Sequence, residues 1–351
     1  MSSRIPLYQT IGIDVGGANI KIAEPDGRSM SAVFPLWKHP DRLGEQVRGM
    51  LAEFGRPQTL AVTLTGELAD CYQTRREGVT RILDQLTTCI EPSGIQVYAV
   101  DGSWKTVREA QLDPWSVAAA NWSALAHWLC RFPPTAAACI VAVLLDIGST
   151  TTDIIPIRNG RPDLAARTDR SRLQCGRLVY TGLSRTPVCA VVKRLKLRGE
   201  FVPVMAEFFA MVDDAYVISG RVAEAPNDVE SADGRPRTIE CARARIARMI
   251  GEDSETIDSA EIDSLADQII EAQVDQIAAA LAVNLQPDAA ILVTGHGNSP
   301  AELVIDQLGL RSRTIKLSDL LGPEASRSAP AVAVAWLWEH GVAQDQESQS
   351  E

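Results

Sequence analysis

Residues 11–23 read IGIDVGGANIKIA, and residues 144–157 read LLDIGSTTTDIIPI. Each stretch contains a short apolar run, an aspartate, a glycine-containing turn with small or hydroxylated residues, and a second apolar run. The corresponding positions are Asp14 and Asp146, Gly16 and Gly148, and Lys21 and Asp153. This duplication predicts two β-hairpins in two similar lobes, with both turns facing one ligand.

The two turns have the composition of phosphate-binding loops. Glycine lets backbone N–H groups approach anionic oxygens because no Cβ is in the way. An aspartate at the end of the first strand can hold a hydrated Mg²⁺, which neutralises phosphate charge. We therefore expect Asp14 and Asp146 to hold Mg²⁺, and phosphate contacts from the turn residues Gly16, Gly17, Asn19, Gly148, Ser149, Thr150 and Thr151. A lone turn of this kind is often a plain hairpin, and the duplication favours the shared ligand.

Composition and motif spacing exclude several other classes. Neither turn fits the G-x-x-x-x-G-K-[ST] loop of Walker-type NTPases or the G-x-G-x-x-G unit of Rossmann dehydrogenases. A net charge of −11 on 351 residues argues against nucleic-acid and anionic-membrane partners. The seven cysteines form no C-x-x-C pair and the four histidines no H-E-x-x-H motif, which argues against a disulfide framework or a zinc hydrolase.

The sequence also predicts a cytoplasmic location. The N-terminal segment MSSRIPLYQT is too polar for a signal peptide, and the apolar run at residues 136–145 is too short to span a bilayer. The oligomeric state is not determined by these features.

A second set of candidates follows a predicted buried strand at residues 60–64. Thr65, Gly66 and Glu67 open the segment TGELAD, at the strand end where α/β proteins usually place a site. Glu67 is a candidate general base or metal-directed acid, and the alternative is a capping turn for the next helix. Lys21 either contacts a phosphate oxygen or points to solvent.

Further candidates lie in the second half of the chain. The segment YTGLSRTPVC offers Thr181, Gly182, Arg185 and Thr186, whose guanidinium and hydroxyl groups suit phosphate or carboxylate. Asp153 is a further candidate ligand for Mg²⁺, and Asp169 is either a catalytic neighbour or a solvated surface residue. Gly295 and Gly297 in VTGHGN follow another predicted buried strand and make a glycine-rich turn.

Strands and helices alternate along the chain, which predicts an α/β fold. Helices are expected at residues 41–54, 74–86, 114–131, 262–285 and 331–340, and Trp115, Trp122 and Trp128 are expected in the core of the third. The predicted domains are an N-terminal lobe at 1–135, a C-terminal lobe at 136–342 and a disordered tail at 343–351. Residues 221–237 read either as a mobile loop near the substrate or as a passive surface excursion.

The paired turns resemble the phosphate motifs of the ASKHA superfamily, which includes sugar kinases, heat-shock chaperones and actin. The whole chain resembles its hydantoinase/oxoprolinase-like branch. TGELAD, YTGLSRTPVC, ADGRPRT (232–238), ARMIGED (247–253) and VTGHGN resemble the subgroup linked to tetrahydromethanopterin C1 transfer and related to the archaeal methanofuran-biosynthesis synthase.

This resemblance implies a two-lobed actin/sugar-kinase-like, ribonuclease-H-like fold with a duplicated mixed-sheet core and a central cleft. It favours a transferase that joins an aminomethylfuran-methyl diphosphate to a phenolic acceptor of tyramine or tyrosine type and releases diphosphate, with Mg²⁺ bound and Glu67 as the base. The alternatives are an ATP-dependent small-molecule kinase or oxoprolinase/hydantoinase-type hydrolase, and a nucleotide sensor or scaffold. The glycine-rich turn departs from the longer turns of clear ATP users, which leaves ATP open as a cofactor.

Overall fold

The computed structural model describes residues 9–348, and the polar segment at 1–8 lies outside them. The chain divides into two compact units. Unit 1 comprises Met1–Ala142, Ile155–Ser171 and Lys316–Glu351, and unit 2 comprises Val143–Ile154 and Arg172–Ile315. The first segment of unit 1 ends near the lobe boundary expected at residue 135, whereas 155–171 and 316–342 group with unit 1 and not with a continuous second lobe.

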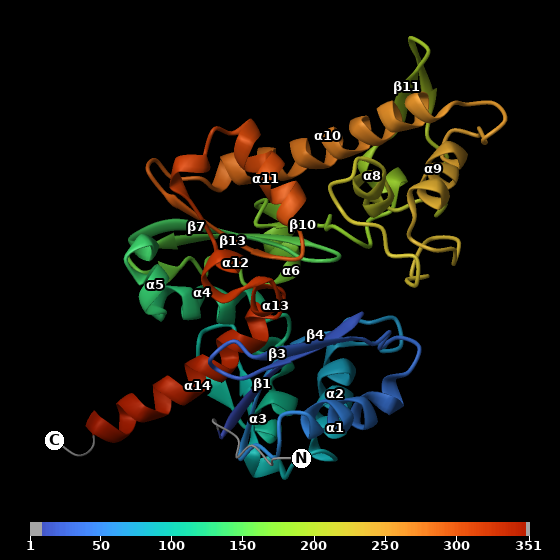
Figure 1. The fold of residues 1–351 in the computed structure, drawn as a ribbon. Coiled ribbons are helices and arrows are strands. Elements are labelled where there is room, and N and C mark those ends of the chain that lie inside the picture. The colour runs from blue at the N-terminus through green and yellow to red at the C-terminus, as the bar shows by residue number, and fades with distance from the viewer. Residues whose placement is uncertain (1–8, 349–351) are drawn as a thin grey trace. The chain divides into compact units, whose positions relative to one another are not determined.

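Unit 1 is built on a six-stranded mixed sheet with the order β3-β2-β1-β4-β5-β6 (Figure 1). Its strands are β1 (Thr10–Gly16), β2 (Asn19–Ala23), β3 (Ser29–Val33), β4 (Thr59–Thr65), β5 (Ile95–Tyr98) and β6 (Trp104–Lys105). β1 pairs antiparallel with β2 and parallel with β4, so the first turn and the TGELAD segment both leave the sheet at the same edge. The register pairs Gly16 with Thr65 at that edge.

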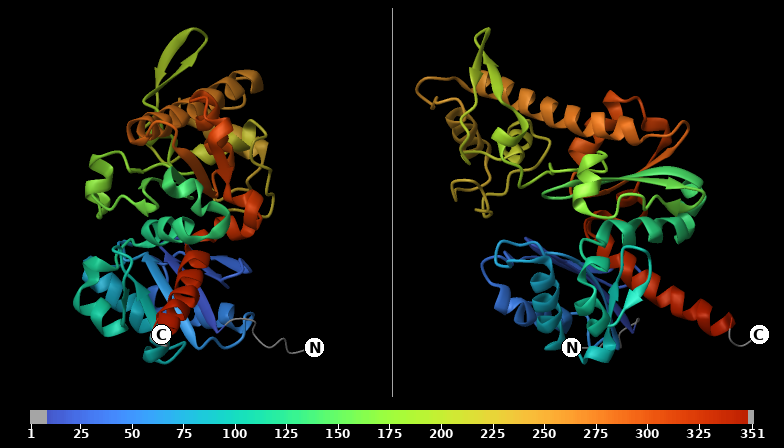
Figure 2. Two further views of the ribbon diagram at one scale, coloured as in Figure 1. Left: turned by 90° about the vertical axis from the view of Figure 1, so that its left-hand side faces the viewer. Right: turned by 180° about the vertical axis from the view of Figure 1, so that it is seen from behind.

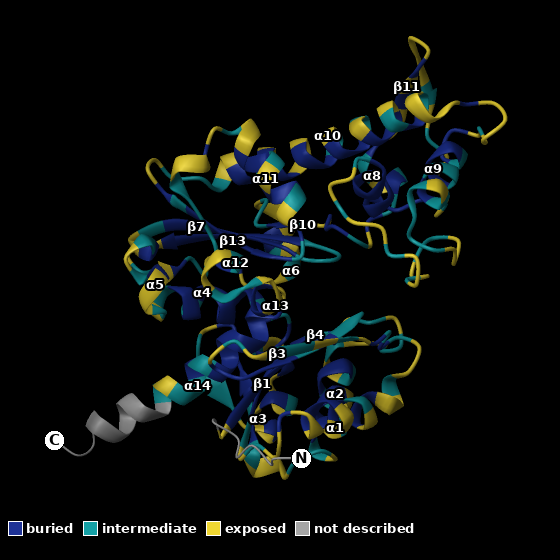
Figure 3. Ribbon diagram, in the orientation of Figure 1, coloured by how far each residue is buried: buried dark blue, intermediate teal, exposed yellow. Residues whose placement is uncertain are grey.

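Helices cover both faces of this sheet. Side chains at alternate β1 positions, such as Ile11 and Ile13, are buried in one core with α1 (Leu43–Ala52) and α2 (Arg75–Thr87). On the opposite face α14 (Ala329–Ser348) packs so closely that a Cβ on Gly12 would clash with the carbonyl of Ala331. The central strands are accordingly almost fully buried (Figure 3). The remaining helices of unit 1 are α3 (Val107–Leu112), α4 (Asn121–Arg131), α5 (Pro133–Ala136), α12 (Leu317–Leu321) and α13 (Pro323–Arg327).

The second sheet of the chain, which contains most of the strands of unit 2, repeats the same topology. Its order is β10-β8-β7-β13-β14, with β9 paired to β8. The strands are β7 (Val141–Ile147), β8 (Thr152–Arg158), β9 (Arg161–Pro162), β10 (Leu178–Val179), β13 (Ala290–Gly295) and β14 (Thr314–Lys316). Apart from β9 and β6, each sheet has its strands in the order third, second, first, fourth and fifth. The predicted duplicated α/β core is therefore confirmed.

The rest of unit 2 is mainly helical. Its longest helix is α10 (Ser259–Asn284), and the two-stranded hairpin of β11 (Arg194–Leu197) and β12 (Glu200–Pro203) stands at the N-terminal half of that helix (Figure 2). The shorter helices are α7 (Val188–Val191), α8 (Val212–Ile218), α9 (Ile239–Arg248) and α11 (Asn298–Gln307), and α6 (Asp169–Gln174) crosses from one unit's residues to the other's. Among residues 9–348 the structure contains no helix with the length and apolarity that a membrane span needs.

Two predictions about the elements are wrong in part. The helix expected at 114–131 begins only at Asn121, because Ala118 forms a bridge with Leu64 and Ala119 has a positive φ of 49°. Pro114 starts a short 3₁₀ turn, Pro114–Ser116, in which Trp115 is exposed, whereas Trp122 and Trp128 are buried as expected. In the expected tail, residues 343–348 continue α14, and 349–351 lie outside the described residues.

Candidate active site

Glu67 is buried at the end of β4, in the segment that leads to α2. Its side chain is about 1% exposed, and its Oε2 atom has no hydrogen-bond partner among the described residues. A Cβ on Gly78 would clash with the carbonyl of Glu67, so α2 lies directly against this residue. Helix α2 is instead capped by Thr74, whose side chain accepts from the amide of Glu77. The capping interpretation of Glu67 is therefore wrong.

Arg75 and Asp169 form an ion pair close to Glu67. The Arg75 Nη2 and Asp169 Oδ2 atoms are 2.5 Å apart, and both residues act electrostatically on the Glu67 carboxyl. The guanidinium of Arg75 also lies over the Trp115 ring, 5.4 Å from its centroid. Asp169 is thus part of this cluster and not a freely solvated residue.

Burial dominates the ionisation of Glu67. Desolvation raises the pKa of this carboxyl to about 7, while backbone hydrogen bonds from Glu67 itself and from Ala119 and the charge of Arg75 lower the pKa only partly. The Asp169 charge raises it slightly. A group that titrates near neutral pH exists in both protonation states, which suits general acid–base catalysis.

The first turn lies beside the TGELAD segment within unit 1. The amide of Gly66 donates to the carbonyl of Val15 at 2.9 Å, and a Cβ on Gly66 would lie 3.1 Å from the Gly16 backbone. The carbonyls of Gly17 and Ala18 accept from Leu36 and Phe34, which orders the turn. A Cβ on Gly17 would meet nothing within 4 Å, so this position borders open space.

Asp14 and Lys21 pair across the β1–β2 hairpin. Their side chains are 3.6 Å apart, and the Thr65 hydroxyl lies 3.5 Å from Asp14 Oδ1. Burial raises the pKa of Asp14, although Lys21 lowers it. We expected Lys21 either to contact a phosphate oxygen or to point to solvent. The structure instead pairs it with Asp14 on the neighbouring strand. Asn19 opens β2 opposite Val33.

The second turn is held by the YTGLSRTPVC segment within unit 2. The Gly148 amide donates to the Thr151 carbonyl at 2.8 Å, and the Ser149 carbonyl accepts from Ser184 and Arg185. A Cβ on Gly182 would lie 2.6 Å from the amide nitrogen of Thr150, so only glycine fits there. The fold therefore places the YTGLSRTPVC segment directly against the second turn.

The hydroxyl groups of this segment make internal contacts. Thr186 accepts from the Gly182 amide at 2.9 Å, and Thr181 accepts from Gln273 of α10 at 2.7 Å. The Thr152 hydroxyl donates to the Thr181 carbonyl at 2.7 Å. These buried contacts give Thr181 and Thr186 a structural role in supporting the second turn.

The glycine-rich turn packs directly against the strand that precedes the second turn. His296 and Gly297 donate their amides to the Ile147 carbonyl at 2.8 and 2.9 Å. Gly295 has a φ of 97°, and an added Cβ would lie 2.5 Å from Asp146 Oδ1. Close packing therefore explains both glycines, Gly295 and Gly297, without a nucleotide.

The expected Mg²⁺ ligands have few acidic neighbours. Asp153 is buried and pairs with Arg172 at 2.6 Å, and Asp14 pairs with Lys21. Among the described residues, there is no group of three or more histidine, cysteine, aspartate or glutamate side chains that could hold a metal. Since Mg²⁺ often takes one or two carboxylates plus substrate phosphates, a ligand would have to supply most of its coordination. The Mg²⁺ site stays a prediction, as does the joint action of the two turns.

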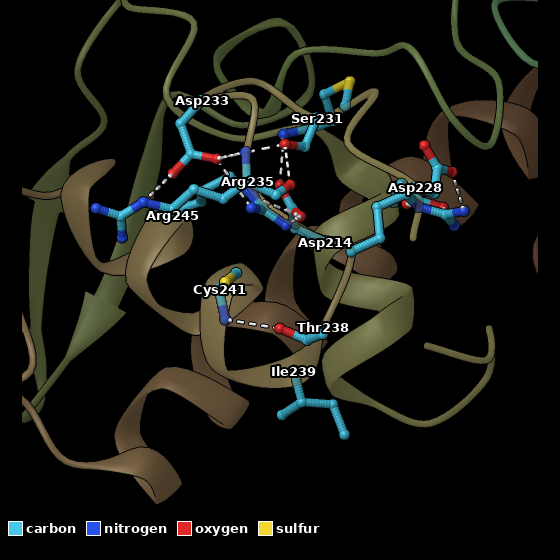
Figure 4. Close-up of polar contacts among 12 residues, drawn as sticks. Asp214, Asp228, Ser231, Asp233, Arg235, Thr238, Ile239, Cys241 and Arg245 are labelled. Carbon is cyan, nitrogen blue, oxygen red and sulfur yellow. Dashed lines mark hydrogen bonds and ion pairs between the residues drawn. The ribbon is translucent and has the colours of Figure 1, made fainter. Parts of the chain in front are cut away.

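The segment at residues 221–237 is anchored by partly buried ion pairs to α8 and α9 (Figure 4). Arg245 of α9 is fully buried and binds Asp214 at 2.7 Å and Asp233 at 3.0 Å. Arg237 makes two hydrogen bonds to Asp213, at 2.7 and 2.9 Å, and one to Asp228. Asp233 and Arg237 both belong to the ADGRPRT motif, so this motif has a structural function.

Sequence reasoning missed Arg75, Trp115 and Ala119. Arg75 is the first residue of α2, where the helix dipole disfavours a cation, and this placement was a usable signal of a tertiary partner. Ala119 carries no signal in its sequence, because its positive φ and its contact with Glu67 depend on the bridge between Ala118 and Leu64.

A family model described as Hydantoinase/oxoprolinase matches residues 58–340. The chain belongs to this family. The chain is 32% identical to a (4-{4-[2-(gamma-L-glutamylamino)ethyl]phenoxymethyl}furan-2-yl)methanamine synthase of Methanocaldococcus jannaschii over 93% of this chain and 96% of the relative. It is 26% identical to the synthase of the same name from Methanococcus vannielii, over 56% of this chain and 89% of the relative. The predicted relationship to the hydantoinase/oxoprolinase family and to the methanofuran-biosynthesis synthase is confirmed.

Among solved structures, this hydantoinase/oxoprolinase family chain is similar to the ethanolamine utilization protein EutJ from Carboxydothermus hydrogenoformans. The TM-score is 0.47 with 11% sequence identity, over 95% of this chain and 92% of EutJ.

The comparisons contradict the reaction that we expected. We expected transfer of a furfuryl group from its diphosphate to a tyramine- or tyrosine-type phenol, with release of diphosphate. The relatives are named as synthases of a compound that contains a γ-L-glutamylamino group, which is an amide, and their name includes no diphosphate. The diphosphate-releasing furfuryl transfer is therefore withdrawn.

Proposed function

We propose that the chain is a synthase of methanofuran-type cofactor biosynthesis. Its product would be of the class named for its relatives, a furan-methanamine with a phenoxymethyl arm that ends in a γ-glutamylaminoethyl group. The observation that carries this proposal is the extent of the similarity to the M. jannaschii synthase, which spans 93% of this chain and 96% of the relative. Similarity of this extent includes both units and not one shared domain.

Glu67 is the acid–base group in this proposal. A condensation in which an N–H or O–H group is the nucleophile must remove the proton of that group. A carboxyl with a pKa near 7 can take this proton at neutral pH. Arg75 and Asp169 balance each other's charge beside it, so Arg75 does not fully stabilise the Glu67 carboxylate.

The two turns would bind a phosphate-bearing ligand, for which a nucleotide is the first candidate. Asp14 and Asp146 would hold Mg²⁺ together with the phosphates, and the bound ion would neutralise their negative charge. Isothermal titration with MgATP should show binding that is lost in Asp14→Asn and in Asp146→Asn. The control is Asp26→Asn, whose side chain lies in an exposed turn. Full MgATP affinity in both Asp14→Asn and Asp146→Asn would refute the role of the turns.

The synthase itself can be tested by replacement of a relative. In an M. vannielii strain that lacks its own synthase, expression of this chain should restore the compound for which the relative is named, as measured by mass spectrometry of cell extracts. Expression of Glu67→Gln at equal protein level should not restore it. Absence of the compound despite folded wild-type protein would overturn the proposal. Restoration by Glu67→Gln would overturn the role of this residue and would favour a scaffold or sensor.

A second candidate function follows from the family itself. The description of the matching family model favours an ATP-dependent hydrolase of hydantoin or 5-oxoproline rings. Phosphate release from MgATP that depends on 5-oxo-L-proline or hydantoin, together with the ring-opened product, would support this hydrolase. MgATP hydrolysis that is independent of both compounds would argue against it. The cytoplasmic location stays a prediction.

A further inference from the structure

Trp115 is unusual among the tryptophans of this chain. The described residues include all seven tryptophans, and in this set Trp115 alone is exposed, at 60%, while the others are buried or half-buried. Leu112, one turn earlier, and Leu68, next to Glu67, are also exposed. Large apolar side chains in water near a site are a common feature of ligand-binding surfaces.

The backbone around Trp115 is fixed against the end of β4. The carbonyl of Ser116 accepts from Val100 at 2.8 Å, and Ala118 bridges to Leu64. The next residue, Ala119, makes the backbone hydrogen bond to Glu67. The 3₁₀ turn that carries Trp115 is therefore held in place by the same segment that contacts the acid–base group.

The side chain of Trp115 is also joined to the site. The guanidinium of Arg75 lies 5.4 Å from the ring centroid, and the same guanidinium pairs with Asp169 and acts on Glu67. A cation over an indole ring is attracted to the face of the ring. The indole is thus an aromatic surface that is exposed to water and linked through Arg75 to the buried carboxyl of Glu67.

We propose that the Trp115 indole packs against an aromatic ring of the substrate and so determines the preference of this site for aromatic compounds. This inference rests on the proposed function, because the relatives' named product carries a phenyl ring and a furan ring. Aromatic pairs prefer stacked or edge-to-face contacts, and such a contact adds to the gain from apolar burial. Trp115 is then a specificity-determining residue, while Glu67 performs the proton transfer.

The test is isothermal titration of the purified chain with two compounds. One is the product named for the relatives, and the other is γ-L-glutamylethylamine, which has the glutamyl arm and no ring. Trp115→Ala should weaken binding of the product about tenfold, the size expected for one aromatic contact, and Trp115→Phe should restore most of it. Binding of γ-L-glutamylethylamine should be equal in all three proteins.

The β11–β12 hairpin offers a matched control. Phe201 is 58% exposed and has the guanidinium of Arg194 at 4.3 Å from its ring centroid, so Phe201→Ala removes a similar aromatic surface elsewhere. It should leave product binding unchanged. Wild-type affinity for the product in Trp115→Ala would overturn this inference and leave the proposed function intact. If the wild type binds neither the product nor γ-L-glutamylethylamine, the proposed function is wrong and the inference is wrong with it.

Discussion

Glu67 and Asp14 are both buried carboxylic acids that act near a cation, but their surroundings differ. Lys21 lies 3.6 Å from Asp14 on the neighbouring strand, whereas the cation near Glu67, Arg75, is engaged by Asp169 at 2.5 Å. Burial raises the pKa of both carboxyls, and the pKa of Glu67 reaches about 7. The two carboxyls thus differ in how far a neighbouring cation offsets the effect of burial, and Glu67 is the one whose cation is shared with another carboxylate.

Glu67→Gln should make the protein more stable at alkaline pH. Below pH 4.5, the ordinary value, Glu67 is protonated in both the folded and the unfolded chain. Between this pH and about 7 only the unfolded chain loses the proton, so the free energy of unfolding falls as the pH rises. Above about pH 7 the free energy of unfolding is lower than at acid pH by about 3 kcal/mol because of this group. Glutamine does not ionise, so Glu67→Gln does not suffer this loss.

Urea unfolding at pH 5 and pH 8 measures this effect. The gain of Glu67→Gln over wild type should be much larger at pH 8 than at pH 5. Glu91→Gln, whose side chain is exposed, should show no such gain. An equal effect of Glu67→Gln at both pH values would contradict the raised pKa.

Gly17→Ala should weaken phosphate binding at the first turn without a large change in the free energy of unfolding. Because an added Cβ at Gly17 meets nothing within 4 Å, the free energy of unfolding should change by less than about 1 kcal/mol. The added methyl group would occupy space beside the turn amides, so MgATP binding should weaken. Gly66→Ala places its Cβ 2.7 Å from Leu36 Cδ2 and should cost about 1–3 kcal/mol of stability. Unchanged MgATP affinity in Gly17→Ala would argue against phosphate binding at this turn.

At the scale of elements, ion pairs to helices α8 and α9 hold the loop at residues 221–237 in place. Residues 221–237 contain little regular structure, yet Asp228 and Asp233 bind Arg237 and Arg245. Arg237 also pairs with Asp213 of α8, and Arg245 also pairs with Asp214 of the same helix. The mobile-loop interpretation of this segment is therefore not supported by its contacts.

Replacement of Arg245 by methionine should destabilise this part of unit 2 strongly. The substitution leaves Asp214 buried without its cation, which typically costs about 3–5 kcal/mol. The matched control is Arg243→Met on the same helix, because Arg243 pairs with Asp263 at the surface and such pairs contribute about 0–1 kcal/mol. Urea unfolding of the two variants distinguishes them, and equal losses of stability would contradict a buried network.

At the scale of the whole molecule, unit 1 is assembled from three separate segments of the chain. Helix α14 covers one face of its sheet, and Ala331 of that helix lies directly against Gly12 of β1. A sequence cut at the lobe boundary expected at residue 135 would therefore separate the sheet from its cover.

The fragment 1–135 should consequently fail to fold by itself. Removal of α14 exposes the apolar β1–β4 face that the helix covers, so circular dichroism should show no cooperative urea transition for this fragment. Truncation after Val342, which removes only the segment expected from the sequence to be a polar tail, is the control and should keep the transition. Cooperative unfolding of 1–135 would contradict the role of α14.

The sequence by itself determined the duplicated hairpins, the turn residues and the position of Glu67 after β4. These features are local: alternation of apolar residues, glycines at turns and a polar segment after a buried strand are each visible within about ten residues. The family relationship was visible for the same reason, because its motifs are short and contiguous.

Only the tertiary structure decided which neighbours each of these residues has. The pairing of Arg75 with Asp169 joins positions 94 apart in the sequence, and the contact of Ala119 with Glu67 needs a parallel bridge between distant segments. The ionisation of Glu67 and the exposure of Trp115 depend on these contacts and not on residue type. Desolvation and charge act through space, so the properties that make Glu67 a candidate catalytic residue arise only once the chain has folded.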